Sequence, residues 1–328
     1  MSMANDVGGR RRSIDSAPPR EDLVADVAAM YYQQRLDQEE IARQVGVSRS
    51  TVSRMLAEAL ESGIVEIRIR RPLPLADDLQ AKLVETFGLR DALVLDARGV
   101  GRDALARVGQ LAARYLETNL GDGDVLAISW GLGVRSVADA LEPRRPAQVE
   151  VVQMLGGAGS RDPDIDGTEL ARRFAAQMGG RYRFLNAPLI VDDEAVAAAL
   201  LRQRSVRETL AIAAGADIAV VGIGAFVREV SSLLRAGHIT EQGLQQIRQL
   251  GAVGDVCGHF FTVTGAPVDS EVSRRIVAID VAALRRIPRI VGLASGAQKA
   301  EAIAGALRAR LVNVLVTDDA TARAVLKI

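Results

Sequence analysis

The 328-residue sequence predicts an α/β protein with a small N-terminal helix-turn-helix and a larger, Rossmann-like domain built on a parallel sheet. Three observations support this. Residues 36–59 have the apolar spacing of two short helices joined by a tight turn. From Leu75 onward, amphipathic helices alternate with short apolar strands, as in a parallel sheet covered on both faces. Hydrophobic residues make up 48% of the chain, enough for one small and one large core.

The chain is expected to divide into three segments. Residues 1–19 are rich in Gly, Ser and Pro and predict a disordered tail. Residues 20–71 hold the helix-turn-helix, which begins with an additional packing helix over residues 22–34. Residues 72–328 form the larger domain, and the stiff Pro72-Leu73-Pro74 leads into it.

The helix-turn-helix prediction depends on residues that begin and end helices. Asp37 can cap a helix over residues 38–44, Gly46 permits a tight turn, and Ser48 can cap a second helix. The buried face of that second helix would consist of Val52, Met55 and Leu56. The other face is left to short polar and basic side chains, which a DNA-binding helix presents to bases and phosphates. The DNA-binding candidates are Gln38, Ser48, Arg49, Ser50, Thr51, Ser53 and Arg54. An ordinary helical hairpin with a solvated polar face is the alternative.

A strand is expected soon after the second helix, because residues 64–70 alternate apolar with polar side chains. Such a strand is typical of a winged helix-turn-helix. Arg68, Arg70 and Arg71 would then lie along the DNA backbone, where each positive charge releases counterions.

The composition limits the classes of function. Lys and Arg number 41, as do Asp and Glu, so the net charge is zero and any DNA-binding surface is local. One cysteine and two histidines exclude an intramolecular disulfide and predict neither a metal site nor a cofactor. No apolar run could span a membrane and no signal-peptide core is present, so we expect a cytoplasmic protein.

Helices and strands alternate through the larger domain. Helices are expected over residues 79–87, 105–119, 134–141 and 170–178. Strands are expected over residues 92–95, 125–128, 149–153, 218–222, 289–293 and 312–316. In such sheets ligands bind beyond the carboxyl ends of the strands, so the chemistry is expected there.

Two segments at strand ends suit an anion, phosphate above all. Ser129-Trp130-Gly131-Leu132-Gly133 follows the strand at residues 125–128 and leads into a helix whose first N–H groups attract negative charge. Lys299, one of only three lysines against 38 arginines, stands at the start of a helix after another strand. The alternatives are a tight turn without a ligand and a solvated surface lysine.

Further residues are weaker candidates for contacts with a sugar. Asp255 stands in a glycine-flanked turn where it could bind a hydroxyl group. The other three are Gln153, Asp166 and Arg235. Cys257 and His259 are expected to be buried residues of a strand without a role.

Two Gly-x-Gly pairs suggest a dinucleotide site, but neither fingerprint is complete. Ser136 occupies the third glycine position after Gly131 and Gly133, and Val227 occupies it after Gly222 and Gly224.

The chain resembles the SorC/DeoR-type family of bacterial sugar-responsive transcriptional regulators from about Leu23 to Leu326. The N-terminal match is LDQEEIARQVGVSRSTVSRMLAEALESGIVEIRI. The later matches are ISWGLGV, VVQMLGG, VVGIGAF, GAVGDVCGHFF, SGAQKAEAIAGAL and VNVLVTDDATARAVL.

The resemblance implies an effector domain similar to phosphosugar isomerases and glucosamine-phosphate deaminases, a phosphorylated sugar as effector, and a homotetramer or dimer. It assigns the phosphate to Ser129, Trp130, Gly131, Leu132, Gly133 and Lys299. It assigns the rest of the pocket to Gln153, Asp166, Arg235 and Asp255. Many members have threonine or arginine-threonine where this chain has Leu132-Gly133, so an unphosphorylated polyol or another small molecule is an alternative effector.

The leading prediction is a DNA-binding transcriptional regulator of a carbohydrate or polyol catabolic operon that has no enzymatic activity. Its partners would be operator DNA, a small effector and further copies of itself. The second hypothesis is a sugar-phosphate isomerase or deaminase with an appended DNA-binding part, which would use Asp255 and Asp166. The third, a nicotinamide-dependent oxidoreductase, is disfavoured by the incomplete fingerprints.

Overall fold

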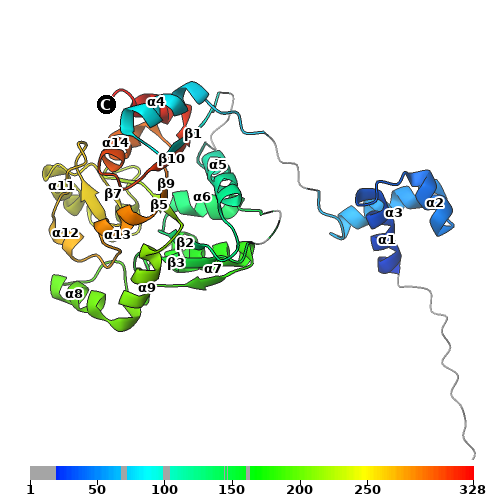
Figure 1. Cartoon of the computed structure of the whole chain (residues 1–328), viewed down its shortest axis with the longest axis horizontal. Helices are drawn as coiled ribbons and strands as arrows, with labels where there is room; N and C mark the ends of the chain where they lie inside the picture. The colour runs from blue at the N-terminus through cyan, green and yellow to red at the C-terminus, as the bar shows by residue number, and fades with distance from the viewer. Residues whose placement is uncertain (1–19, 68–71, 99–103, 144, 146, 160–162) are drawn as a thin grey trace, which may run out of the picture. The chain divides into compact units, whose positions relative to one another are not determined.

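The computed structural model describes residues 20–67, 72–98, 104–143, 145, 147–159 and 163–328 (Figure 1). The predicted tail and the arginines of the predicted wing therefore lie outside the described residues. The chain forms two compact units, Met1–Pro72 and Leu73–Ile328, which are called the N-terminal and C-terminal units below.

The N-terminal unit contains three helices, α1 (Arg20–Tyr32), α2 (Gln38–Val45) and α3 (Arg49–Glu61). Asp37 caps α2 by accepting the N–H groups of Glu39 and Glu40 at 2.9 and 2.8 Å, and the Glu40 carboxylate accepts the Asp37 N–H at 3.1 Å. This reciprocal capping box fixes the start of α2. The small core comprises Val24, Val27, Ala28, Ile41, Ala42, Val52, Met55, Leu56 and Ala59.

The turn between α2 and α3 forms as the sequence predicts. Gly46 has a φ of 74°, a left-handed conformation that glycine adopts without strain, and its N–H donates to the Ala42 carbonyl. The Ser48 hydroxyl then accepts the Thr51 N–H at 3.2 Å and caps α3. The predicted helix-turn-helix is confirmed.

The described part of the predicted wing is not a strand. The Val65 N–H donates to the Ala59 carbonyl at 2.8 Å, so the chain folds back on the end of α3. A strand requires a partner, and residues 64–67 pair with none among the residues described. The alternating pattern was therefore misleading at these positions.

Within the described part of the C-terminal unit, seven strands form one sheet in the order β1-β10-β9-β5-β2-β3-β4, and all neighbours are parallel. The strands are β1 (Asp91–Leu95), β2 (Val125–Ile128), β3 (Glu150–Gln153), β4 (Arg181–Arg183), β5 (Ile218–Gly222), β9 (Arg289–Leu293) and β10 (Val314–Asp318). The register places Leu126 beside Val151 on one side and Ile218 on the other. The predicted parallel sheet is confirmed, although β10 begins two residues later than predicted.

Helices cover both faces of this sheet (Figure 1). One face packs against α5 (Ala104–Asn119), α6 (Leu132–Ala140) and α7 (Gly167–Met178). The other face packs against α4 (Asp77–Phe87), α9 (Arg204–Ala214), α13 (Val281–Arg286), α14 (Ala300–Arg308) and α15 (Asp319–Val325). Successive side chains of a strand point to opposite faces of the sheet, so alternate residues of each strand contribute to the hydrophobic core on one face and to the core on the other.

A smaller antiparallel sheet follows β5 and belongs to the same layer as α14. It consists of β6 (Gly224–Ala225), β7 (Gly254–Val256) and β8 (His259–Phe261). The predicted strand position of Cys257 is wrong, because Cys257 lies in the β7–β8 turn with a φ of 50°. The remaining helices are α8 (Glu194–Arg202), α10 (Ser232–Arg235), α11 (Glu241–Gln249) and α12 (Glu271–Arg274), and the 3-10 turns are η1 (Pro163–Ile165) and η2 (Ala297–Lys299).

Candidate functional site

The exposed face of α3 carries most of the predicted DNA-binding residues. Arg49, Ser50, Ser53 and Arg54 are exposed, whereas Val52 on the opposite face is fully buried. The first turn of α3 contains no acidic residue, although α2 has Glu39 and Glu40 there. A phosphate approaching the N-terminus of α3 therefore meets N–H groups and guanidinium groups without carboxylates from that turn.

Some predicted DNA-binding residues have structural bonds of their own. The Ser48 hydroxyl lies 2.8 Å from the hydroxyls of both Ser50 and Thr51, and Arg54 Nη2 lies 3.5 Å from Thr51 Oγ1. These contacts order the start of α3. Gln38, the first residue of α2, shares a shallow surface depression with Arg49. DNA contact by these residues stays a prediction.

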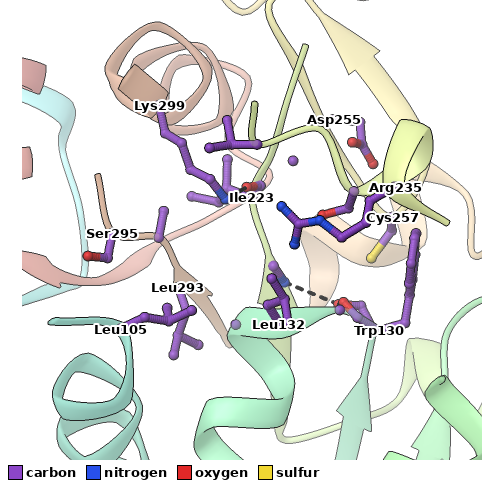
Figure 2. Close-up of a pocket in the computed structure, with 18 residues that line it drawn as sticks. Leu105, Trp130, Leu132, Ile223, Arg235, Asp255, Cys257, Leu293, Ser295 and Lys299 are labelled. Carbon is purple, nitrogen blue, oxygen red and sulfur yellow. Dashed lines mark hydrogen bonds between the residues drawn. The ribbon is translucent and has the colours of Figure 1, made fainter. Parts of the chain in front are cut away.

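A cavity of about 160 Å³ lies at the carboxyl ends of three neighbouring strands, β2, β5 and β9 (Figure 2). A single water molecule needs about 10–15 Å³ of cavity volume, so this cavity is large enough for a small molecule. The lining brings together residues that are far apart in the chain. It comprises Leu105, Ser129, Trp130, Gly131, Leu132, Gly133, Gly222, Ile223, Gly224, Val230, Ser232, Arg235, Asp255, Cys257, Leu293, Ala294, Ser295 and Lys299.

The loop after β2 presents the start of α6 to this cavity. Gly131 has a φ of 106°, which side-chain-bearing residues rarely adopt, and no side chain caps α6. The first N–H groups of a helix have no partner within the helix, so those of Leu132 and Gly133 are available to a ligand. Ser129 has a different role, because its hydroxyl accepts the Gly222 N–H at 3.1 Å and so joins the loop after β2 to the end of β5.

Trp130 forms a further part of the lining. Its ring meets the His238 ring edge-on, with the centroids 5.9 Å apart. Burial lowers the pKa of His238, so this imidazole is predominantly neutral at neutral pH. Trp130 is also the only tryptophan of the chain.

Two cations and one carboxylate meet in the cavity. Lys299 Nζ donates to the Ile223 carbonyl at 3.2 Å, and burial lowers its pKa, an effect that nearby Asp255 opposes. The Asp255 carboxylate accepts the Gly258 N–H at 3.2 Å, and burial raises its pKa to about 6. Arg235 extends its guanidinium toward the cavity from α10 (Figure 2).

The carboxylate also explains why a glycine occupies position 224. A Cβ atom there would lie 2.0 Å from Asp255 Oδ1, closer than real Cβ contacts occur. Glycine therefore lets β6 pass directly beside the carboxylate. Gly224 has this packing role, and both Gly222 and Gly224 line the same cavity as Gly131 and Gly133.

Two predicted pocket residues do not line the cavity. Gln153 is 1% exposed, and its amide oxygen accepts the Leu185 N–H at 2.9 Å. Asp166 caps α7, with its two oxygens accepting the N–H groups of Thr168 at 2.8 Å and Gly159 at 3.1 Å. Both side chains are engaged by the backbone, and their expected place in the pocket is not found.

The sequence reasoning missed Ser295 and the residue that orients it. The Ser295 hydroxyl donates to Asp318 at 2.7 Å, and the 4% exposed Asp318 also accepts from the Thr321 N–H and hydroxyl. Ser295 follows β9 by two residues, so the rule that ligands bind at strand ends could have found it. Asp318 is the last residue of β10 and lies two residues beyond the predicted end of that strand.

Two general features of the described residues bear on function. No described helix combines the length and the apolar character that crossing a membrane requires. Nor do three or more His, Cys, Asp or Glu side chains of the described residues gather as metal ligands would.

Comparison with known families agrees with both units. The family model described as "Putative sugar-binding domain" matches residues 72–327, and the model of sigma-70 region 4 matches residues 22–62. The first match covers almost the whole C-terminal unit, and the second covers the helix-turn-helix.

Similar proteins extend over nearly the whole chain. The deoxyribonucleoside regulator of Bacillus subtilis (strain 168) is 33% identical over 310 residues, 93% of this chain and 97% of that protein. The sorbitol operon regulator of Klebsiella pneumoniae is 30% identical over 308 residues, 93% of this chain and 98% of that protein. The crystal structure of the full-length sorbitol operon regulator SorC from Klebsiella pneumoniae has a TM-score of 0.75 and 29% identity, covering 94% of this chain and 100% of that chain. The chain therefore belongs to the SorC/DeoR-type family of sugar-binding transcriptional regulators.

Proposed function

We propose that this regulator binds operator DNA through α3 and a phosphorylated sugar through the cavity of the C-terminal unit. The observation that carries the effector proposal is the meeting of Lys299, Arg235 and the uncapped start of α6 at one cavity. Two cations and a helix N-terminus around a single carboxylate suit a ligand with more than one negative charge. A phosphate monoester has that charge, and Asp255 would accept a hydroxyl group of the sugar.

The sequence left the phosphate in doubt because Leu132-Gly133 lack hydroxyl and guanidinium donors. Arg235, which reaches the cavity from α10, supplies a guanidinium from elsewhere in the chain (Figure 2). Backbone N–H groups of Leu132 and Gly133 need no particular side chain to bind phosphate oxygens. A phosphorylated sugar is therefore favoured over an unphosphorylated polyol.

We also propose that the C-terminal unit binds its sugar ligand without converting it into a product. Sugar isomerisation needs an acid–base pair beside the substrate. Asp255 is the one carboxylate among the lining residues described, and His259 Nε2 lies 2.7 Å from the Ile279 carbonyl. Asp166, the other carboxylate of the enzyme hypothesis, caps a helix. Release of an isomerised or deaminated product by the purified protein would contradict this part.

The names of the similar proteins support a proposal about the kind of operon that this regulator controls. Their names refer to a sorbitol operon and to deoxyribonucleosides, so we assign this regulator to a carbohydrate or polyol operon. We propose a cytoplasmic location, because the operator DNA on which this regulator would act lies there. Several copies of α3 are needed for tight binding because each unit offers only a small basic surface, so we propose self-association into dimers or tetramers.

Effector binding can be tested with the fluorescence of Trp130, which lines the cavity. A panel of sugars, polyols and their phosphates should contain a phosphorylated compound that changes this emission and raises the unfolding temperature. Lys299→Ala should weaken binding about tenfold or more, since a charge-assisted bond is lost. Lys82→Ala removes an exposed lysine of α4 and should have no effect. A best ligand without phosphate that ignores Lys299→Ala would contradict the proposal.

Operator binding can be tested separately in a gel-shift assay. Arg49→Ala and Arg54→Ala should each lower specific affinity by about tenfold to a hundredfold, the range expected for a lost base contact. Arg20→Ala is the matched control, because Arg20 pairs with Glu58 and stands outside the exposed face of α3. Unchanged operator affinity in both variants, with the fold intact, would contradict the assignment of α3.

A further inference from the structure

A second cavity lies at the opposite end of the sheet from the cavity that contains Lys299. Its volume is about 430 Å³, within the range of pockets that hold small molecules. It is lined by Asp91, which begins β1, and by Arg289, which begins β9, whereas the first cavity lies where β9 ends at Leu293. Four residue steps of strand put about 13 Å between Arg289 and Leu293, so the two cavities are separate.

The second cavity is a groove between α5 and the starts of these strands. Arg114 and Tyr115 come from α5, which lies beside β1 (Figure 1). Arg90 immediately precedes β1, and Arg289 comes from the distant β9. The fold thus gathers three arginines from separate parts of the chain, and the cavity is called the arginine groove from here on.

Positive charge exceeds negative charge in the arginine groove. Its lining contains Arg90, Arg114 and Arg289, against Asp91 as the one carboxylate among the described lining residues. The Asp91 carboxylate accepts the Ala92 N–H at 2.8 Å, so it is already engaged by the backbone. An excess of guanidinium groups at one concave surface favours an anionic ligand.

Two of these arginines have no ion-pair partner. Arg90 and Arg289 form no ion pair with any carboxylate in the part of the chain that the structure describes. At the other edge of the sheet, by contrast, Arg181 and Arg183 both pair with Glu150, at 3.2 and 3.0 Å. Arg289 is only partly exposed, so its guanidinium has lost some water without gaining an ion pair. A bound anion would supply the missing partner.

Tyr115 adds a hydroxyl donor to the arginine groove. Burial raises the pKa of Tyr115, an effect that the Asp91 charge reinforces and the Arg289 charge opposes, so the hydroxyl keeps its proton at neutral pH. Thr118 and Asn119 also line the groove, but their side chains donate to backbone carbonyls of α5 at 2.8 Å each. The donors left for a ligand therefore include two guanidinium groups and one phenol.

We infer that the arginine groove is a second ligand site, which binds a phosphate group, either inorganic phosphate or the phosphate of a small metabolite. Arg90 and Arg289 hold the phosphate oxygens through their guanidinium N–H groups, and Tyr115 donates a further hydrogen bond. The site shares no lining residue with the cavity that contains Lys299, so the inference does not depend on the proposed effector.

Thermal unfolding of the full chain tests this site. Inorganic phosphate and glycerol 3-phosphate are each compared with chloride at equal ionic strength. The measurements use the Lys299→Ala variant, in which phosphate binding at the first cavity is weakened. We expect at least one of the two phosphates to raise the unfolding temperature of this variant without changing the emission of Trp130, which reports on the first cavity.

Substitutions in the same background identify the residues that bind phosphate. Arg90→Ala and Arg289→Ala should each raise the apparent dissociation constant for phosphate about tenfold or more, because a charge-assisted hydrogen bond is lost. Arg90 is exposed, so its variant provides the test even if Arg289→Ala does not fold. Arg248→Ala, the matched control, removes an exposed arginine of α11 outside the groove and should leave the constant unchanged.

The possible outcomes are distinct. Equal stabilisation by phosphate in all three arginine variants would overturn the inference, as would the absence of any stabilisation in Lys299→Ala, and neither result would affect the proposed function. A changed oligomeric state in the groove variants, with stabilisation by phosphate retained, would overturn it too, because the groove would then contact another copy of the chain. Loss of stabilisation in the groove variants alone would support the site. The phosphate that binds more tightly would then identify the source, a metabolite or free phosphate.

Discussion

Asp255 is held in the cavity at an energetic cost. Burial raises its pKa from 3.8 to about 6, and the Gly258 N–H and the Lys299 charge oppose that shift. A carboxylate kept in such a place destabilises the protein when ionised, because its folded pKa exceeds its unfolded pKa. Retention of an unfavourable charge where ligand can reach it is typical of functional sites.

Replacement of this carboxylate should therefore stabilise the protein without effector. As pH rises from about 4 to 6, the unfolded chain loses the Asp255 proton before the folded chain does, so the contribution of Asp255 to stability falls. Asp255→Asn should raise the unfolding temperature at about pH 7, and its advantage should shrink toward pH 5. Thermal unfolding across this range measures both effects, with exposed Asp192→Asn as control. A variant less stable than the native chain at pH 7 would contradict the prediction.

Individual residues differ in how far the sequence can predict their roles. Lys299 was predictable as a pocket residue because it stands at the start of a helix that follows a strand, and Asp255 because glycines flank it. Gln153 lies at the end of a strand, yet its amide bonds to Leu185, thirty-two positions along the chain. The tertiary fold brings Leu185 next to Gln153, and a local sequence pattern cannot predict a hydrogen-bond partner so distant in the chain.

At the scale of elements, the turn from β2 into α6 depends on backbone conformation. Gly131 has a φ of 106°, whereas neighbouring Gly133 has no positive φ. A Cβ at position 131 would meet no atom within 4 Å, and one at position 133 would meet Leu293 at an ordinary 3.5 Å. Position 131 therefore favours glycine because of its backbone conformation, whereas neither position is so crowded that a Cβ atom would be excluded.

These two glycines should respond differently to alanine. Gly131→Ala should cost about 1–3 kcal/mol, because alanine is strained at this φ. Gly133→Ala should be neutral or slightly stabilising, since it lies within α6 and reduces the entropy of the unfolded chain. Chemical denaturation of both variants measures the difference. Equal stability of the two variants would show that the turn is not under the inferred constraint.

Strands could be predicted where the pattern of apolar residues in the sequence matches the burial of those residues in the fold. β2, β5 and β9 begin and end as predicted, since continuous apolar runs are buried on both faces. β10 extends over Thr317 and Asp318, which are buried because Ala294, Thr321 and Ser295 satisfy their polar atoms. The residues after α3 alternate like a strand but fold back on that helix.

At the scale of the whole molecule, regulation requires that the C-terminal unit affects the N-terminal unit. A ligand shifts an equilibrium only through different affinities for two states, and such coupling is reciprocal. If the effector changes operator affinity by a given factor, operator DNA must change effector affinity by the same factor, typically about 5–150-fold.

This reciprocity can be measured with one preparation of protein. Gel shifts with and without effector give one factor, and Trp130 titrations with and without operator DNA give the other. We expect the two factors to agree and to disappear together in Lys299→Ala. A change in operator affinity without a matching change in effector affinity would show that the effector acts by another route.

The distribution of the cavity along the chain has a consequence for synthesis. Its lining is complete only when Lys299 has been made, whereas α3 ends at Glu61. At about 5–20 residues per second, the ribosome finishes the helix-turn-helix roughly 10–50 seconds before the cavity. Each new molecule therefore presents its DNA-binding helix before it has a site that can sense an effector.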